Sequence, residues 1–175
     1  PAYRKHLESL RKKTKLKLFT ASAVSGKTKP DMVIVKSSEP RQWLEGRKAD
    51  IVYGVEQSKE RDTIKQKKSG LNQVLCSLAR QKGKIIGFDF SSILKPSGQK
   101  RVVMMGRMMQ NIQLCRKYKV ETCIASFARD PLDMRNPKDM LALFEELGMP
   151  AGEARQALKS AGERLESGQK KQKDF

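Results

Sequence analysis

The sequence segment best suited to binding chemistry places two cations at the start of a predicted helix. Asn136 and Pro137 predict that start, because an Asn side chain caps free helical N–H groups and Pro suits the first helical position. Arg135 and Lys138 flank it. Since the free N–H groups of a helix N-terminus favour anions, this combination predicts a phosphate site. Helix capping beside a solvated charged surface explains the same residues equally well.

Ligands for metal-dependent hydrolysis are scarce. A catalytic metal needs several His, Asp or Glu side chains that converge on one point. The single histidine, His6, lies in a predicted basic helix near the start of the sequence. Asp89 lies inside a predicted strand, and Asp130 and Asp133 share one loop, where Asp side chains commonly stabilise turns. We therefore expect this chain to hold no metal and no cofactor of its own.

Covalent catalysis also lacks its usual residues. Cys76, Cys115 and Cys123 all fall on apolar faces of predicted elements, where cysteine behaves as a small hydrophobic residue. No histidine is placed to activate a serine or a thiol, and no phosphate-binding glycine loop or nucleophile-elbow motif occurs. The sequence predicts no catalytic residue.

Charge is the strongest compositional signal. The 175 residues include 37 Lys and Arg against 19 Asp and Glu, a formal net charge of +18. The excess is present in both halves, with 18 basic and 8 acidic residues in 1–75 and 19 and 11 in the remainder. Such a distribution is typical of a protein that binds a polyanion, and nucleic acid is the expected partner. The chain has few aromatic residues, which favours recognition of backbone and shape over base stacking.

Compartment signals point to the cytoplasm. The odd cysteine count without a C-x-x-C pair argues against a disulfide scaffold or a zinc knuckle. The start of the sequence shows no apolar signal-peptide segment, and no run of 18 apolar residues could span a bilayer. We expect a reduced, cytoplasmic protein without membrane contact.

The elements that must position these residues alternate between strand and helix along the chain. Strands are predicted by short β-branched apolar runs bounded by Pro or Gly, and helices by apolar residues at three- and four-residue spacing. Strands are expected over 15–22, 32–35, 50–55, 84–90 and 121–127, and helices over 3–13, 41–47, 71–81, 98–118, 137–147 and 151–160.

This alternation predicts a parallel sheet with helical crossovers, as in an open α/β sheet or part of an α/β barrel. We expect one domain over 1–165 and a flexible basic tail over 166–175. In the long helix, Val102, Met105, Met109 and Ile112 form the predicted buried stripe. Met104 and Met108 lie beside that stripe and are the candidates for a protein interface.

Several short motifs, in order and spacing, resemble archaeal ribonuclease P protein component three, the family of the thirty-kilodalton human subunit. The main one is Met134-Arg135-Asn136-Pro137-Lys138-Asp139 within 127–160. The others are Gly70-Leu71-Asn72-Gln73-Val74-Leu75, Gly87-Phe88-Asp89-Phe90-Ser91-Ser92-Ile93-Leu94, Arg116-Lys117-Tyr118-Lys119-Val120 and Gly148-Met149-Pro150.

The resemblance implies a TIM-barrel-like fold related to the polymerase-and-histidinol-phosphatase barrel, without its metal site. The family opens with a strand, a helix and a second strand that have no counterpart before Tyr3, so we expect a barrel incomplete at its N-terminal side, either because the chain is trimmed or because its lineage has a reduced barrel. The implied function is support of ribonuclease P, whose RNA removes 5′ leaders from precursor tRNA with magnesium held by the RNA. The implied partners are that RNA, the component-two (Pop5-family) subunit in a two-by-two heterotetramer, an L7Ae relative and, indirectly, precursor tRNA.

The residues expected to contact RNA start with Arg135 and Lys138, which match the family motif and also satisfy the helix-terminus argument. Further expected contacts are basic residues elsewhere in the chain: Lys67, Lys68, Arg80, Lys82, Lys100, Arg101 and Arg129. Two alternatives remain open: a metal-dependent phosphoesterase of the parent barrel fold, and a general basic RNA-binding protein.

Overall fold

Five parallel strands follow one another in chain order across a single sheet. The computed structural model describes residues 21–22, 31–46, 48–63, 67–128 and 130–173. The strands are β1 (Ala21–Ser22), β2 (Met32–Lys36), β3 (Ile51–Tyr53), β4 (Ile85–Asp89) and β5 (Thr122–Ala125). Within these residues the sheet is open, because β1 and β5 are its two edges. The predicted parallel α/β architecture is confirmed.

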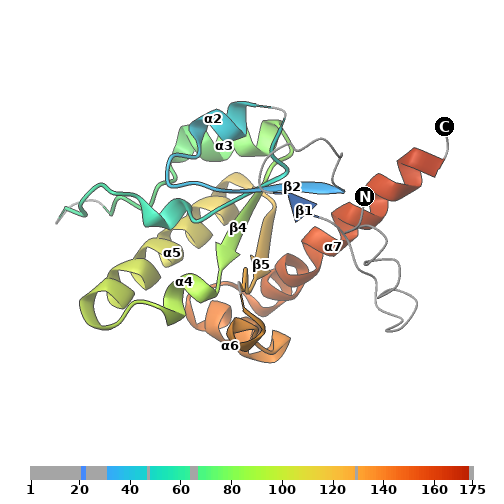
Figure 1. Ribbon diagram of the computed structural model, residues 1–175. Helices are drawn as coiled ribbons and strands as arrows, with labels where there is room; N and C mark the ends of the chain where they lie inside the picture. Colours follow the sequence, from blue (N-terminus) through green and yellow to red (C-terminus); the bar gives the residue numbers. More distant parts are fainter. Residues whose placement is uncertain (1–20, 23–30, 47, 64–66, 129, 174–175) are drawn as a thin grey trace.

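Helices cross over between β2 and β3, between β3 and β4 and between β4 and β5, as parallel pairing requires, and two more described helices follow β5. They are α2 (Arg41–Glu45), α3 (Gln73–Gln81), α4 (Ser91–Leu94), α5 (Gly98–Tyr118), α6 (Pro137–Glu146) and α7 (Ala151–Lys173), with short 3-10 turns η1 (Val55–Gln57) and η2 (Pro131–Asp133). In Figure 1, β4 and β5 lie at the centre, α2 and α3 above them, and α6 below.

Alternate residues of each strand face opposite sides of the sheet. One side, the helix-covered face, carries Val52, Ile86 and Ile124, which join the large core built with α2, α3, α5, α6 and α7. The other side, called here the inner face, has a smaller cluster: Met32, Ile51, Ile85 and Cys123, with Ala161 and Leu165 of α7 packed against it. Both sides of the sheet are therefore covered by apolar contacts, at least at the amino ends of the strands.

The expected boundaries of the long helix are confirmed at Gly98–Tyr118, and Ile112 of its predicted stripe is buried, but two of the four stripe positions are wrong. Val102 is 61% exposed and Met109 is 39% exposed, whereas Met108 is fully buried. The reason is that this helix also buries two polar residues, Arg107 and Asn111. Apolar periodicity therefore did not mark its buried side.

Further expectations concern the two ends of the chain and the helix α3. The tail expected over 166–175 is helical through Lys173, because α7 continues that far and runs past the sheet in Figure 1, while its flexibility stays a prediction. Val74, predicted on an apolar helix face, is 63% exposed. The helix expected over 3–13 and most of the strand expected over 15–22 lie outside the described residues.

Candidate nucleic-acid interface

The last residues of three neighbouring strands line a pocket at the carboxyl edge of the inner face. Lys36, Tyr53 and Asp89 end β2, β3 and β4, and Phe127 follows β5 by two residues. Together they line one side of a pocket of about 790 Å³. Because side chains alternate along a strand, these strand-end residues share the face that carries Ile51 and Ile85 further down.

An aromatic pair forms part of that pocket. The Tyr53 and Phe127 rings stack with centroids 3.9 Å apart and planes 2° from parallel. Gly87 lies against both, since a Cβ there would come within 2.9 Å of Tyr53 Cβ and 3.3 Å of Phe127 Cζ. Phe127 adopts a φ of 42°, a left-handed conformation that costs a non-glycine residue ~1–2 kcal/mol. The stack therefore depends on the missing side chain at Gly87 and on the left-handed backbone of Phe127.

Lys36 is positioned by a second close approach. Gly54 has a φ of 75°, and a Cβ there would lie 3.1 Å from Lys36 Cγ and 3.2 Å from its Cε. The Lys36 ammonium nitrogen lies 5.9 Å from the centre of the Tyr53 ring, within range of a cation–π contact. The side chain therefore follows a defined course toward the pocket.

Two acidic side chains lie beneath this edge. Asp89 is buried, and its Oδ1 accepts a hydrogen bond from Ser91 N–H at 2.9 Å. Burial raises the pKa of Asp89, and nearby Lys36 offsets part of that effect. Glu56 is fully buried, and neither carboxylate oxygen has a hydrogen-bond partner among the described residues. Burial raises the pKa of Glu56 to about 7, with a smaller contribution from Asp89.

The opposite wall of the pocket comes from α5 and the segment before it. Pro96, Val103 and Met104 supply apolar surface, and Lys95 and Lys100 supply charge. Arg101 shapes this segment, because its guanidinium donates to Pro96 O at 2.8 Å and to Leu94 O at 3.2 Å.

A second hollow of about 450 Å³ adjoins the first, and Ser58 lines both. Its basic lining residues are Arg41, Lys59, Lys67 and Lys68. The segment that follows η1 therefore forms a wall common to the pocket and this hollow.

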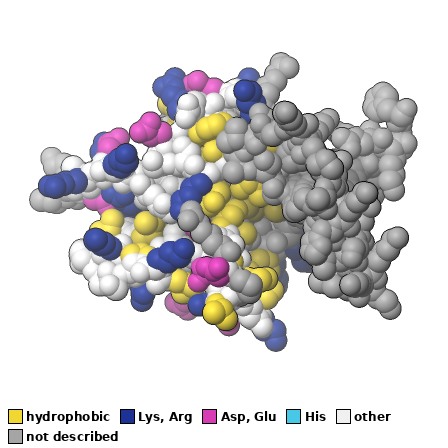
Figure 2. All heavy atoms as spheres, in the orientation of Figure 1, with side chains coloured by type: hydrophobic (Ala, Val, Ile, Leu, Met, Phe, Trp, Pro, Cys, Tyr) yellow, Lys and Arg dark blue, Asp and Glu magenta, His cyan; other side chains and the backbone are white. Residues whose placement is uncertain are grey.

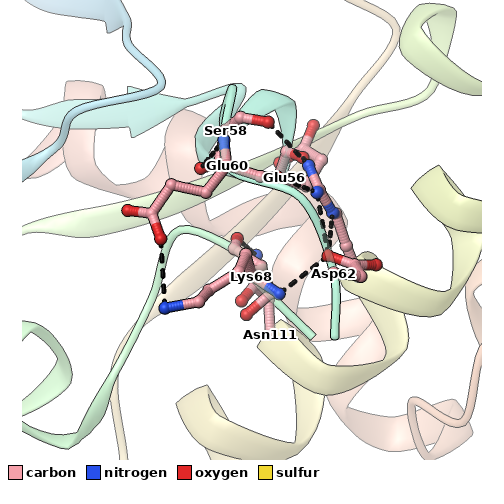
Figure 3. Close-up of polar contacts among 8 residues, drawn as sticks. Glu56, Ser58, Glu60, Asp62, Lys68 and Asn111 are labelled. Carbon is pink, nitrogen blue, oxygen red and sulfur yellow. Dashed lines mark hydrogen bonds and ion pairs between the residues drawn. The ribbon is translucent and has the colours of Figure 1, made fainter. Parts of the chain in front are cut away.

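Two buried side chains of α5 hold that loop (Figure 3). The Arg107 guanidinium donates to the carbonyl oxygens of Glu56, Ser58 and Glu60, at 3.1, 2.7 and 2.6 Å. Asn111 Nδ2 donates to Ser69 O at 2.8 Å. These bonds fix both ends of the segment between η1 and α3.

Comparison with known proteins agrees with this architecture. The sequence model of the family described as RNase P subunit p30 matches residues 61–173. The chain belongs to this family.

The p30-family assignment is supported by individual relatives. The chain is 36% identical over 97 residues to ribonuclease P protein component 3 of Methanosarcina acetivorans, which is 55% of this chain and 41% of that protein. It is 33% identical over 93 residues to the protein of that name in Thermococcus kodakarensis, 53% of this chain and 42% of the relative. The matches thus span less than half the length of these relatives.

A solved structure shares the fold. A chain in a structure of archaeal ribonuclease P with mature tRNA superposes with a TM-score of 0.79 and 18% sequence identity, covering 95% of this chain and 76% of that one. The TIM-barrel-like fold expected for a p30-family chain is thus supported, although the described strands form an open sheet.

The basic residues expected to contact RNA divide between the two ends of the sheet. Three pairs lie on segments that follow the carboxyl ends of strands, the side on which barrel-type α/β folds place their sites. They are Lys67 and Lys68 after β3, Lys100 and Arg101 in α5 after β4, and Arg135 and Lys138 around the start of α6 after β5. Arg80 and Lys82 lie at the other end of α3, before β4. Arg129 is outside the described residues.

Several of these cations already have partners within the chain. Lys68 Nζ lies 3.1 Å from Glu60 Oε2. Arg135 Nη1 donates to Leu132 O and Met134 O, at 2.8 and 3.0 Å, so it shapes the loop before α6. Lys67 lies across α5, where a Cβ at Gly106 would be 3.0 Å from its Nζ. In the described part of the chain, no ion pair within 4 Å is found for Lys67, Lys100 or Lys138.

The predicted start of α6 is confirmed in detail. Asn136 Oδ1 accepts a hydrogen bond from Lys138 N–H at 2.9 Å, and Pro137 occupies the first turn. Gly148 follows the helix with a φ of 91°, as expected for a residue that ends it. The cap therefore occupies one of the N–H groups that an anion would use.

The predicted methionine interface is half wrong. Met108 is fully buried in the core and cannot contact a partner from there. Met104 is half-buried and lines the larger pocket. Whether it meets another protein stays a prediction.

Other absences apply to the described residues only. They contain no group of three or more His, Cys, Asp or Glu side chains that could hold a metal ion. None of the described helices combines the length and hydrophobicity that crossing a bilayer requires. All three cysteines are buried, as expected from their apolar surroundings.

Sequence reasoning missed the pocket. The sequence alone does not single out Lys36, Tyr53 or Phe127, and it places Asp89 inside a strand without a binding role. A usable signal existed: each lies near the carboxyl end of a predicted strand or directly after it, and the carboxyl ends of parallel strands meet at one edge. Arg107 carried no such signal, because a basic residue in a helix normally lies on its surface.

Proposed function

We propose that this chain is a protein subunit of ribonuclease P. It binds the enzyme's RNA and supports the RNA-catalysed removal of 5′ leaders from precursor tRNA. Membership of the p30 family is the observation that carries this proposal. The net charge of +18 supports it, because each phosphate neutralised by Lys or Arg releases counterions from the RNA.

The RNA-binding surface in this proposal is the carboxyl side of the sheet, which carries Lys67, Lys100 and Lys138. Figure 2 shows Lys and Arg side chains spread over the visible face with apolar and acidic side chains between them. Such a surface suits dispersed phosphate contacts, which position an RNA without reading its sequence.

The remaining roles follow from the same proposal. The chemistry belongs to the RNA, which holds the magnesium ions, and this chain supplies no catalytic residue and no cofactor. Its protein partners are the component-two (Pop5-family) subunit and other ribonuclease P proteins, including an L7Ae relative. Precursor tRNA is met indirectly, and the assembly works in the cytoplasm.

Reconstitution with ribonuclease P RNA and the component-two subunit tests the proposal. The double variant Lys67→Ala/Lys138→Ala should weaken RNA binding and reduce the salt dependence of log K by about 2, since about one phosphate contact is lost per lysine. Arg80→Ala/Lys82→Ala, which changes the same charge at the opposite end of α3, is the matched control. Equal losses in both variants would contradict a carboxyl-side surface.

Arg135→Ala separates two roles of one residue. As an RNA contact, it should lower precursor-tRNA processing at every magnesium concentration while the protein stays folded. Unchanged processing would leave Arg135 with its structural bonds to Leu132 and Met134 alone.

Two controls address the alternatives. Purified protein without RNA should not hydrolyse a phosphoester with any divalent metal; turnover would favour the phosphoesterase. Pull-down should recover one structured RNA together with component two, whereas a heterogeneous set of RNAs would favour a general RNA-binding protein.

A further inference from the structure

Among the charged side chains that line the larger pocket, cations outnumber anions. Lys36 reaches it from β2, and Lys95 and Lys100 reach it from the opposite wall, so charge from two sides faces one space. Asp89 is the only carboxylate among the described lining residues, and its pKa is raised by burial. Within the described residues no ion pair within 4 Å involves any of the three lysines. The excess charge in this space favours an anion.

The same pocket has an apolar wall. Phe127, Val103, Met104 and Pro96 line it beside the lysines. A volume of about 790 Å³ falls within the range of small-molecule sites, roughly 300–1,000 Å³. A ligand that combines a flat apolar group with an anionic group matches both parts of the lining.

The pocket is supported by specific backbone features. Gly54 leaves the space that the Lys36 side chain crosses, and Gly87 leaves the space that the Tyr53–Phe127 stack occupies. Phe127 holds a left-handed φ of 42°, and strained residues of this kind cluster at ligand sites. The backbone at Gly54, Gly87 and Phe127 therefore places one cation and one aromatic wall in the same cavity.

We propose that this pocket receives one nucleotide, with its phosphate among Lys36, Lys95 and Lys100 and its base against the wall formed by Phe127 and Met104. The nucleotide is either an unpaired residue of a bound RNA, in which case the inference rests on the proposed function, or a free mononucleotide. Both sources present the same aromatic base and phosphate. The sequence holds few aromatic residues, yet two of them meet here.

Titration of the full chain with fluorescent adenosine 5′-monophosphate and with a labelled single-stranded oligoadenylate tests this. The double variant Lys36→Gln/Lys95→Gln should weaken binding of the occupying ligand about tenfold or more, since charge-assisted contacts to phosphate are lost. The matched control Lys48→Gln/Lys119→Gln removes two exposed charges outside the pocket and should leave that affinity within about twofold at fixed salt.

The two ligands distinguish the sources. Binding of both, with the same sensitivity to the double variant, supports a pocket open to free nucleotides. Binding of the oligonucleotide alone, with that sensitivity, supports an unpaired RNA residue. If neither ligand responds to the double variant more than to the control, the inference is wrong.

Photocrosslinking supplies a readout that does not depend on these lysines. An oligonucleotide with a photoreactive base should crosslink to peptides containing Phe127 or Met104, and excess mononucleotide should compete if it binds. Crosslinks confined to other segments would overturn the inference. RNA binding in the reconstitution above, with Lys67→Ala/Lys138→Ala sensitivity, would then leave the proposed function standing without this pocket.

Discussion

Arg107 Nε and Nη2 both contact one oxygen of Asp62, Oδ1, at 2.9 and 2.8 Å. The same oxygen accepts Lys68 N–H at 2.8 Å. Burial raises the pKa of Asp62, but the hydrogen bonds from Arg107 and Lys68 outweigh it and hold the pKa below its usual value. The carboxylate thus joins Arg107 of α5 to the backbone of Lys68 in the segment between η1 and α3.

Arg107→Ala should destabilise the fold by about 3 kcal/mol, because it removes a buried cation and leaves three loop carbonyls without their donor. Arg107→Lys should recover only part of this, since an ammonium cannot reproduce the planar fork. Urea unfolding measures both. The exposed Arg41–Glu45 pair is the control, and Arg41→Ala should cost about 0.5 kcal/mol or less. Equal costs at the two arginines would contradict the role of Arg107.

Glu56 should make stability fall as pH rises. The ordinary pKa of a glutamate is 4.5 and that of Glu56 in the folded protein is about 7, so between these values the unfolded chain loses a proton that the folded chain keeps. Stability is therefore lost from about pH 4.5 to pH 7 and does not return above that range. Glu56→Gln should remove this fall and gain up to about 3 kcal/mol at pH 8. Unfolding curves at four pH values measure the stability of the wild type and of Glu56→Gln. The same pH dependence of stability in both proteins would refute this role of Glu56.

Gly70 cannot carry a side chain. A Cβ there would lie 1.9 Å from Val55 O, and its φ is 84°. Gly70→Ala should cost at least about 2 kcal/mol in thermal or urea unfolding, because backbone must shift and the conformation is left-handed. Gly162→Ala, in the interior of α7 with open space at its Cβ, should instead stabilise by about 0.5–1 kcal/mol. Because the two Gly→Ala changes should shift stability in opposite directions, each variant serves as the control for the other.

Asn136→Ala should destabilise by about 1 kcal/mol through loss of the cap on α6. Asn136→Asp keeps an acceptor oxygen and should recover most of the stability. Asn72, which caps α3 through Leu75 N–H at 2.9 Å, gives a second example for comparison. If Asn136→Ala and Asn136→Asp lower the free energy of unfolding equally, the side-chain cap contributes nothing to stability.

The sequence predicted those features that depend on neighbours in the chain. The β-branched run of β2, the Asn136–Pro137 helix start and the bounds Gly98–Tyr118 all follow from local preferences. The burial of α5 does not, because Arg107 satisfies its guanidinium with carbonyls roughly fifty residues away. No local pattern contains that information.

The pocket was beyond local inference for the same reason. Lys36 and Phe127 lie 91 positions apart and meet only because β2 to β5 form one sheet. Each is unremarkable in its own segment. Only the strand order shows that both residues face the same pocket.

The three buried thiols can serve as native probes of local unfolding in this protein. Cys76 lies on α3, Cys115 on α5 and Cys123 on β5, all out of solvent. Burial raises the pKa of Cys123 to about 12, so the reactive thiolate is scarce in the folded state. Alkylation of each cysteine under native conditions therefore reports how often its own element separates from the rest, without any engineered probe.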